Sequence, residues 1–207
     1  MKGLILKDIY QLKSYSRVFI ALVIFCVLLA FTEENTIFLM LYPGVLMGMM
    51  PITMYAYDEK AKFHSFLAAL PVRKQDYVTA KYILGIGLNL LTCLLTGTIQ
   101  AIHMISNGTF VFSELLMVIA LAFAVGLVAP AVVLPFIFAL GTEKGRFVNI
   151  IVVAISVSVI SIFMNMGSDF QILMDAQQMI LIALAAALLI YTLSWWITTR
   201  IYDKKEY

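Results

Sequence analysis

Charged residues are scarce in this chain. Only 13% of its 207 residues are Asp, Glu, Lys or Arg, whereas 63% are hydrophobic. A soluble domain usually has about a quarter of its residues charged and about 45–50% apolar, so this composition excludes a water-soluble globule. The apolar residues also lack the alternation of barrel strands and come in long blocks, which predicts membrane-spanning helices.

Residues that form disulfides or bind metals are few as well. Cys26 and Cys93 both lie inside apolar runs, where cysteine behaves as a small buried hydrophobe, so no disulfide framework is predicted. His64 and His103 fall on opposite sides of the membrane in the topology developed below. They therefore cannot hold one metal ion together, and no metal site is predicted.

Catalytic motifs are also missing. The phosphate-binding motif GxxxxGK[ST] does not occur, and the nearest stretch, GTEKGR from Gly141 to Arg146, lacks both its spacing and its ending. Glu33 and Glu34 resemble the start of a paired-glutamate protease motif but have no matching histidine pair, and no GxSxG elbow occurs. An intramembrane enzyme would require a nucleophile or metal cluster that the sequence does not show. We therefore expect a non-catalytic chain.

Six apolar runs are long enough, or nearly so, to cross a bilayer, which needs about 20 residues. They predict an all-α polytopic membrane protein with a six-span domain over residues 17–202. The spans are expected at about 17–32, 36–57, 78–102, 115–140, 147–164 and 179–199. Four prolines, Pro43, Pro51, Pro130 and Pro135, lie inside these runs, where they either kink helices or simply pack.

The connections between the runs alternate in charge. With the N-terminus inside, the cytoplasmic segments carry all 14 basic residues: Lys2, Lys7, Lys13, Arg17, Lys60, Lys62, Arg73, Lys74, Lys81, Lys144, Arg146, Arg200, Lys204 and Lys205. The opposite connections contain acids but no Lys or Arg. Under the positive-inside rule, this partition predicts both termini in the cytoplasm. The N-terminus carries charges throughout and lacks a signal-peptide cleavage site, so we expect it to be mature sequence.

The N-terminal segment, residues 1–16, has an amphipathic pattern. On a helical wheel one stripe contains Leu4, Ile5, Asp8, Ile9 and Leu12, with the lysines away from it. This pattern predicts a helix lying in the inner interface of the membrane. An acid in that stripe is costly against lipid unless it caps or pairs with another group. The helix either only anchors the first span or also touches a cytoplasmic partner.

The cytoplasmic connection at residues 58–77 is more patterned than a simple turn requires. Phe63, Phe66, Leu67 and Leu70 have the i, i+3, i+4, i+7 spacing of one apolar helix face, and Pro71 ends that helix. Two interpretations remain open. The helix either lies on the membrane with a solvated charged face, or it docks a soluble subunit through aromatic anchors surrounded by charges.

The spans themselves contain almost no ionisable groups, which argues against an ion-coupled carrier. Asn89, Thr96 and Gln100 are polar residues of the third span. Such residues usually bond across helices or to their own backbone, and the alternative is that they line a substrate path. The two amides are the stronger candidates for a path, because an amide is harder to satisfy in lipid than a hydroxyl.

Two segments resemble a known family, the membrane subunits of bacterial type-2 ABC exporters, in the small form whose ATPase is a separate chain. They are the opening MKGLILKDIYQLKSYSR and the loop YDEKAKFHSFLAALPVRKQDYVTAKY. The resemblance covers the whole chain and implies that the first segment is an elbow helix and the second a coupling helix received by the ATPase. The residues in or beside the coupling helix would be Asp58, Glu59, Lys60, Phe63, Phe66, Leu67, Leu70, Pro71, Arg73 and Asp76.

The resemblance also implies partners. They are an ATPase subunit carrying ATP and Mg, a second identical or different permease chain, and the bilayer of the bacterial cytoplasmic membrane. No cofactor in this chain and no nucleic acid are expected.

The connection at 165–178 is shorter than the re-entrant helices of larger members would need. Uncharged spans favour amphipathic or hydrophobic cargo, as in phenol-soluble modulin exporters. The alternative is a stand-alone immunity or accessory protein without an ATPase.

Overall fold

The computed structural model describes residues 3–13, 21, 24, 37–69, 73–145, 147, 150–151, 154, 158 and 176–204. Within these residues all regular structure is helical, and no strand occurs. Residues 3–13 form an N-terminal helix, and the other helices are α2 (Ile37–Gly48), α3 (Met50–Lys60), α4 (Phe63–Ala69), α5 (Lys74–Ser106), α6 (Phe112–Leu140) and α8 (Ala176–Asp203). Most of the expected spans at 17–32 and 147–164, and residues 165–175 of the connection at 165–178, lie outside the described residues.

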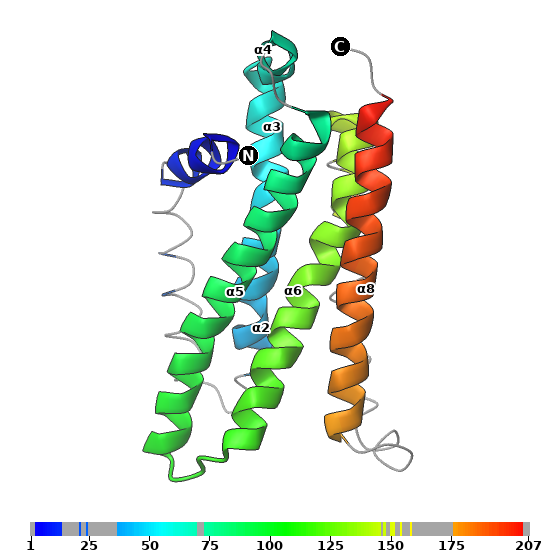
Figure 1. Ribbon diagram of the computed structural model, residues 1–207. Coiled ribbons are helices and arrows are strands. Elements are labelled where there is room, and N and C mark those ends of the chain that lie inside the picture. The colour runs from blue at the N-terminus through cyan, green and yellow to red at the C-terminus, as the bar shows by residue number, and fades with distance from the viewer. Residues whose placement is uncertain are drawn as a thin grey trace.

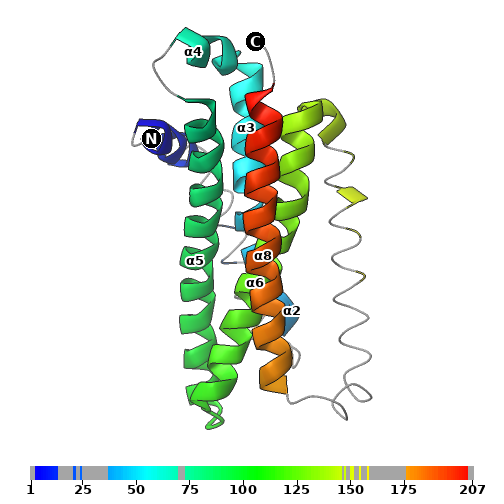
Figure 2. The same ribbon diagram turned by 45° about the vertical axis from the view of Figure 1, so that its right-hand side comes forward.

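Three helices in this part of the chain are long and apolar enough to cross a membrane: α5, α6 and the Ile180–Asp203 portion of α8. They stand side by side in one bundle (Figure 1), which remains evident after a 45° rotation (Figure 2). The 33 residues of α5 would extend about 50 Å at 1.5 Å per residue, more than a hydrocarbon core requires. The apolar runs predicted these three helices, and each extends beyond its predicted span.

The expected span at 36–57 is divided into α2 and α3, which follow one another beside α5 (Figure 1). The division falls at Met49, directly before the helix that carries Pro51 in its first turn. Proline has no N–H to donate and its ring crowds the preceding turn, so a helix tends to break there. In contrast, Pro130 and Pro135 lie within the single continuous helix α6.

Glycines allow α2, α5 and α6 to approach closely. A Cβ atom on Gly48 of α2 would lie 2.3 Å from the carbonyl oxygen of Gly126 on α6. A Cβ atom on Gly126 would in turn lie 2.4 Å from the Asn89 side chain of α5. Membrane helices often associate through such small residues because lipid provides no hydrophobic force between them. The three helices are therefore held in one fixed crossing.

Buried hydroxyls connect α5 to α8. The Tyr82 hydroxyl lies 2.7 Å from Ser194 Oγ and 2.8 Å from Thr198 Oγ1. The Tyr191 hydroxyl donates to the backbone carbonyl of Tyr82 at 2.9 Å, and Ser194 Oγ donates to the carbonyl of Ala131 on α6. Each buried hydroxyl thus has a partner, as burial in an apolar bundle demands.

Two short helices lie across one end of this bundle. The N-terminal helix runs crosswise to α3 and α5, and α4 lies beyond them at the end where α3 finishes and α5 begins (Figures 1 and 2). The last residues of α8 are at the same end, whereas residues 107–111, which join α5 to α6, lie at the opposite end. This arrangement places the predicted cytoplasmic segments together.

Candidate functional site

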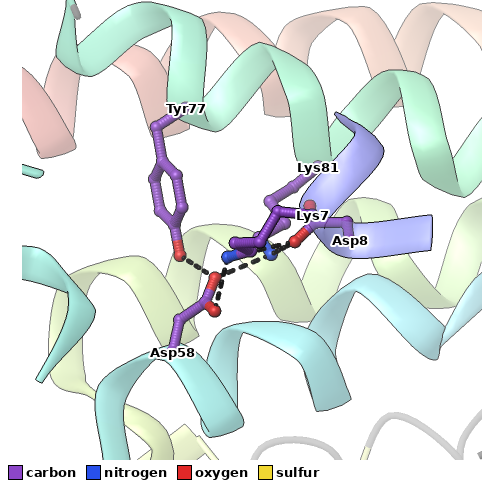
Figure 3. Close-up of polar contacts among 5 residues, drawn as sticks. All are labelled: Lys7, Asp8, Asp58, Tyr77 and Lys81. Atoms are coloured by element: carbon purple, nitrogen blue, oxygen red, sulfur yellow. Dashed lines mark hydrogen bonds and ion pairs between the residues drawn. The ribbon is translucent and has the colours of Figure 1, made fainter. Parts of the chain in front are cut away.

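Charged side chains from three separate segments meet inside this end of the bundle. Lys7 and Asp8 come from the N-terminal helix, Asp58 from α3 and Lys81 from α5 (Figure 3). Lys81 is completely buried, and the residues Asp8 and Asp58 are only 1% and 4% exposed. The Lys7 side chain is partly exposed. We call these four residues the charge cluster.

The cluster is balanced in charge and closely paired. Lys81 Nζ lies 2.8 Å from Asp8 Oδ1 and 2.8 Å from Asp58 Oδ2. Lys7 Nζ lies 2.6 Å from Asp58 Oδ1 and 3.2 Å from Asp8 Oδ1. Each ammonium therefore bridges both carboxylates, and the two positive charges cancel the two negative ones. Buried charges are tolerated only when paired and hydrogen-bonded in this way.

A tyrosine completes the surroundings of Asp58. The Tyr77 hydroxyl donates to Asp58 Oδ2 at 2.7 Å (Figure 3). Burial by itself raises the pKa of Asp58, but the ammonium groups of Lys81 and Lys7 outweigh it and lower the pKa below the usual 3.8. Asp58 lies just beyond the predicted span, and because its pKa is lowered it is ionised at physiological pH.

Aromatic rings surround the cluster and connect it to three further helices, α4, α6 and α8. The ring of Tyr77 lies 6.5 Å from that of Tyr55 on α3, 6.2 Å from Phe63 on α4, 6.1 Å from Phe138 on α6 and 5.7 Å from Tyr202 on α8. These are distances at which aromatic pairs attract one another. Tyr77 thus lies where the ends of α3, α4, α6 and α8 converge on α5.

The first residue of α4 touches the cluster directly. Lys7 Nζ lies 4.0 Å from the centroid of the Phe63 ring, in cation–π contact. Leu67, one turn further along α4, is buried in the same apolar core. Lys62, just before the helix, has a φ of 52°, which turns the chain sharply from α3 into α4. Phe63 and Leu67 therefore hold one side of α4 against the bundle.

The predicted apolar face of α4 is divided between two environments. Phe63 and Leu67 pack inward, whereas Phe66 is 59% exposed. Residues four apart on a helix differ by only about 40° in direction, but Phe66 and Leu67 are about 100° apart, so a short helix on a flat support cannot bury both. Leu70 and Pro71, the other members of the predicted element, lie outside the described residues.

The charged residues expected beside α4 also differ in environment. Lys60 and Arg73 are exposed and Asp76 is partly buried, whereas Asp58 belongs to the charge cluster. Glu59 is also engaged internally, because its Oε2 accepts the backbone N–H of Thr142 at 2.9 Å, just after α6. The Asp58 carboxylate is therefore buried in the cluster, and the Glu59 carboxylate is bonded within the chain through Oε2.

The N-terminal helix departs from its predicted stripe at one position. Leu4 and Asp8 are buried and Ile5 and Leu12 are partly buried, but Ile9 is exposed, as are its neighbours Leu6 and Tyr10. Lys7, which the wheel placed away from the stripe, reaches into the cluster. The inward face is therefore rotated towards Lys7, because its two charged residues pair with α3 and α5.

Sequence reasoning missed Lys7, Tyr77 and Lys81 as members of the site. One signal was present, since an acid in an apolar stripe required a partner, and Asp8 finds that partner in Lys81 of α5. The pairing joins residues 73 positions apart, a separation over which a helical wheel carries no information.

The polar residues predicted for a substrate path lie on the buried side of α5. Asn89 Nδ2 donates to the Phe123 carbonyl at 3.0 Å, and Thr96 Oγ1 donates to the Thr92 carbonyl at 3.0 Å. Both therefore bond across helices or within their own helix. Gln100 is buried too, and its Oε1 has no hydrogen-bond partner among the described residues.

Comparison with known proteins identifies the family to which the chain belongs. Residues 3–203 match the family described as ABC-2 family transporter protein, so the match covers nearly all of the chain. No curated protein and no solved structure matches it. Its long apolar helices agree with the membrane location of that family. The chain is a multi-pass membrane protein and belongs to the ABC-2 family of transporter proteins.

Proposed function

We propose that this chain is the permease subunit of an ATP-driven exporter and that α4 is the surface on which a separate ABC ATPase docks. Membership of the ABC-2 transporter family supports the first part. The form of α4 supports the second, since it lies across the bundle at the end where the predicted cytoplasmic segments gather (Figure 2). ATP and Mg belong to the partner, and this chain transmits the resulting movement.

The observation that supports the proposed docking surface is that one side of α4 packs against the bundle while the other side is exposed. Phe63 and Leu67 hold the helix on the bundle, while Phe66 is exposed, with Lys60 and Arg73 also exposed nearby in the chain. An aromatic anchor within a rim of charges is the usual form of an interface hot spot. Because α4 is packed against α3, α5 and the N-terminal helix, a push on Phe66 would be transmitted to all three.

Phe66→Ala tests this docking surface. The permease is co-expressed with its candidate ATPase, purified through a tag on the permease, and the recovered ATPase is measured. The change should reduce ATPase recovery strongly, because loss of a hot-spot aromatic costs about 2 kcal/mol or more. Phe112→Ala is the matched control, since Phe112 is also exposed but begins α6 at the opposite end. Its recovery should equal that of the wild type.

The outcomes separate the two classes of function. Equal recovery with Phe66→Ala and Phe112→Ala would contradict the docking surface. No recovery with the wild-type chain would instead favour a stand-alone membrane immunity or accessory protein. Correct insertion and equal abundance of both variants must be verified before recovery is compared.

Amphipathic peptides or other hydrophobic compounds are the cargo that we propose. Apart from Lys81 and a few residues near their ends, the helices α5, α6 and α8 carry no Asp, Glu, Lys or Arg, which suits such molecules better than small hydrophilic ions. A second permease chain, identical or different, would complete the translocation path in the bacterial cytoplasmic membrane. Export of amphipathic peptide from cells containing the permease and ATPase, compared with cells containing the ATPase alone, tests the cargo class.

A further inference from the structure

We infer that the charge cluster joins the N-terminal helix to α4 and α5 so that these elements move as one piece when α4 is displaced. The inference rests on the proposed docking of an ATPase on α4. It assigns Asp8, Asp58 and Lys81 the role of positioning residues, which act through the helices that they connect.

The composition of the cluster supports a role in fixing the orientation of the helices relative to one another, and not only a role in stabilising the core. A buried ion network contributes little net stability, because desolvation offsets the attraction, and apolar side chains of similar size often serve as well. Its geometry is nevertheless demanding, since each ammonium must reach two carboxylates from different segments. Such a network determines how the segments are oriented relative to one another, because any relative shift breaks several pairs together.

The cluster is continuous with α4 through Phe63. The Phe63 ring is covered by Lys7 at 4.0 Å and contacts the ring of Tyr77 at 6.2 Å. Tyr77 in turn donates a hydrogen bond to Asp58. A shift of α4 therefore acts on the N-terminal helix through Lys7 and on α3 and α5 through Tyr77. Nothing in this chain of contacts depends on a flexible loop.

The outer face of the N-terminal helix indicates where a movement of α4 would reach the membrane. Leu6, Ile9 and Tyr10 are exposed on the side away from the cluster. A helix with such a face lies at the membrane surface, with its apolar side chains among the lipids. Movement of α4 would thus be carried outwards to the surface of the membrane as well as along α5.

Distance measurements between spin labels test this joint in the complex of permease and ATPase. Labels are placed on exposed positions in a background lacking Cys26 and Cys93: Tyr10 on the N-terminal helix, Ser65 on α4 and, as a reference outside the joined elements, Gln178 on α8. Labelled chains are diluted with unlabelled ones, so that only distances within one chain are recorded. Each pair is measured without nucleotide and with ATP plus vanadate.

In the wild type, both the Ser65–Gln178 and the Tyr10–Gln178 distances should change with nucleotide, because α8 is not part of the joined piece, while the Tyr10–Ser65 distance stays constant. The ion-free variant Lys7→Met, Asp8→Asn, Asp58→Asn, Lys81→Met leaves no unpaired charge and should insert normally. In that variant Ser65 should still move, but the Tyr10–Ser65 distance should now change by about 2 Å or more, a typical helix shift.

The double variant Lys7→Met, Asp58→Asn provides a second measurement if the fourfold variant fails to insert. It leaves Asp8 and Lys81 as a balanced pair but removes the contacts of the Lys7 ammonium with Phe63 and Asp58, so the Tyr10–Ser65 distance distribution should broaden on nucleotide binding. A Tyr10–Ser65 distance that changes in the wild type, or stays constant in the ion-free variant, would overturn the inference. Failure of the wild-type chain to bind the ATPase would refute the proposed function instead.

Discussion

Replacing Lys81 by methionine should lower the free energy of unfolding by about 3–5 kcal/mol, the usual cost of breaking a buried ion pair by removing one partner. Methionine keeps most of the apolar stem but removes an ammonium that lies 2.8 Å from each of two carboxylates. Asp8 and Asp58 would then share Lys7 alone. A net negative charge would remain in a site where both acids are almost completely buried.

The double change Lys81→Met, Asp8→Asn should cost less than the sum of the two single changes. The remaining Lys7 and Asp58 are 2.6 Å apart and balance one another. Neighbouring charged groups commonly show interaction energies of about 0.5–3 kcal/mol in such double-mutant cycles, and a buried network should lie at the upper end. The cycle therefore isolates the interaction from the effect of side-chain size.

The assay is unfolding of the purified protein in mixed micelles by increasing SDS, followed by tryptophan fluorescence. Trp195 suits this purpose, because its Nε1 donates to Thr79 Oγ1 at 3.1 Å and so reports separation of α8 from α5. Lys144→Met is the control, since Lys144 is exposed, and it should change stability by no more than about 0.5 kcal/mol. Strictly additive single changes, or a Lys81→Met variant as stable as the control, would refute the reasoning.

Two further predictions concern the bundle and its orientation. Gly48→Ala should destabilise the protein by about 1–3 kcal/mol, because its Cβ would lie 2.3 Å from a backbone oxygen of α6, whereas Gly87→Ala, with nothing within 4 Å, should be neutral or slightly stabilising in the same SDS titration. Cysteines placed at Ser65 and Asn107 should differ in labelling by a membrane-impermeant maleimide: intact cells should label only Asn107, and permeabilised cells both. Labelling of Ser65 in intact cells would contradict the predicted topology.

Much of the helical framework could be predicted from hydropathy, because a helix that faces lipid must be apolar along its whole length. The runs at 78–102, 115–140 and 179–199 correspond to α5, α6 and α8. The division at Met49 was harder to predict. Pro51 accompanies a helix break, whereas Pro130 and Pro135 lie in a continuous helix, so proline alone does not determine where a membrane helix ends.

The candidate site was predicted in part. The spacing from Phe63 to Leu67 predicted the helix α4 because periodicity is a local property of the chain. It did not predict that Phe66 would be exposed while Leu67 is buried. That difference depends on the surface beneath the helix, which includes Tyr77 of α5 and Lys7 of the N-terminal helix from other parts of the sequence.

The sequence by itself determined that this is a helical membrane protein, where its longest helices lie, and that Asp8 needed a partner. Composition and periodicity suffice for these points because the bilayer acts on each segment separately. Only the tertiary structure decided that the partner is Lys81, that Asp58 and Lys7 complete the cluster, and that Phe63 connects it to α4. The partner of a buried charge depends on which helices cross and how closely, and close approaches such as that of Gly48 to Gly126 are set by the packing of the whole bundle.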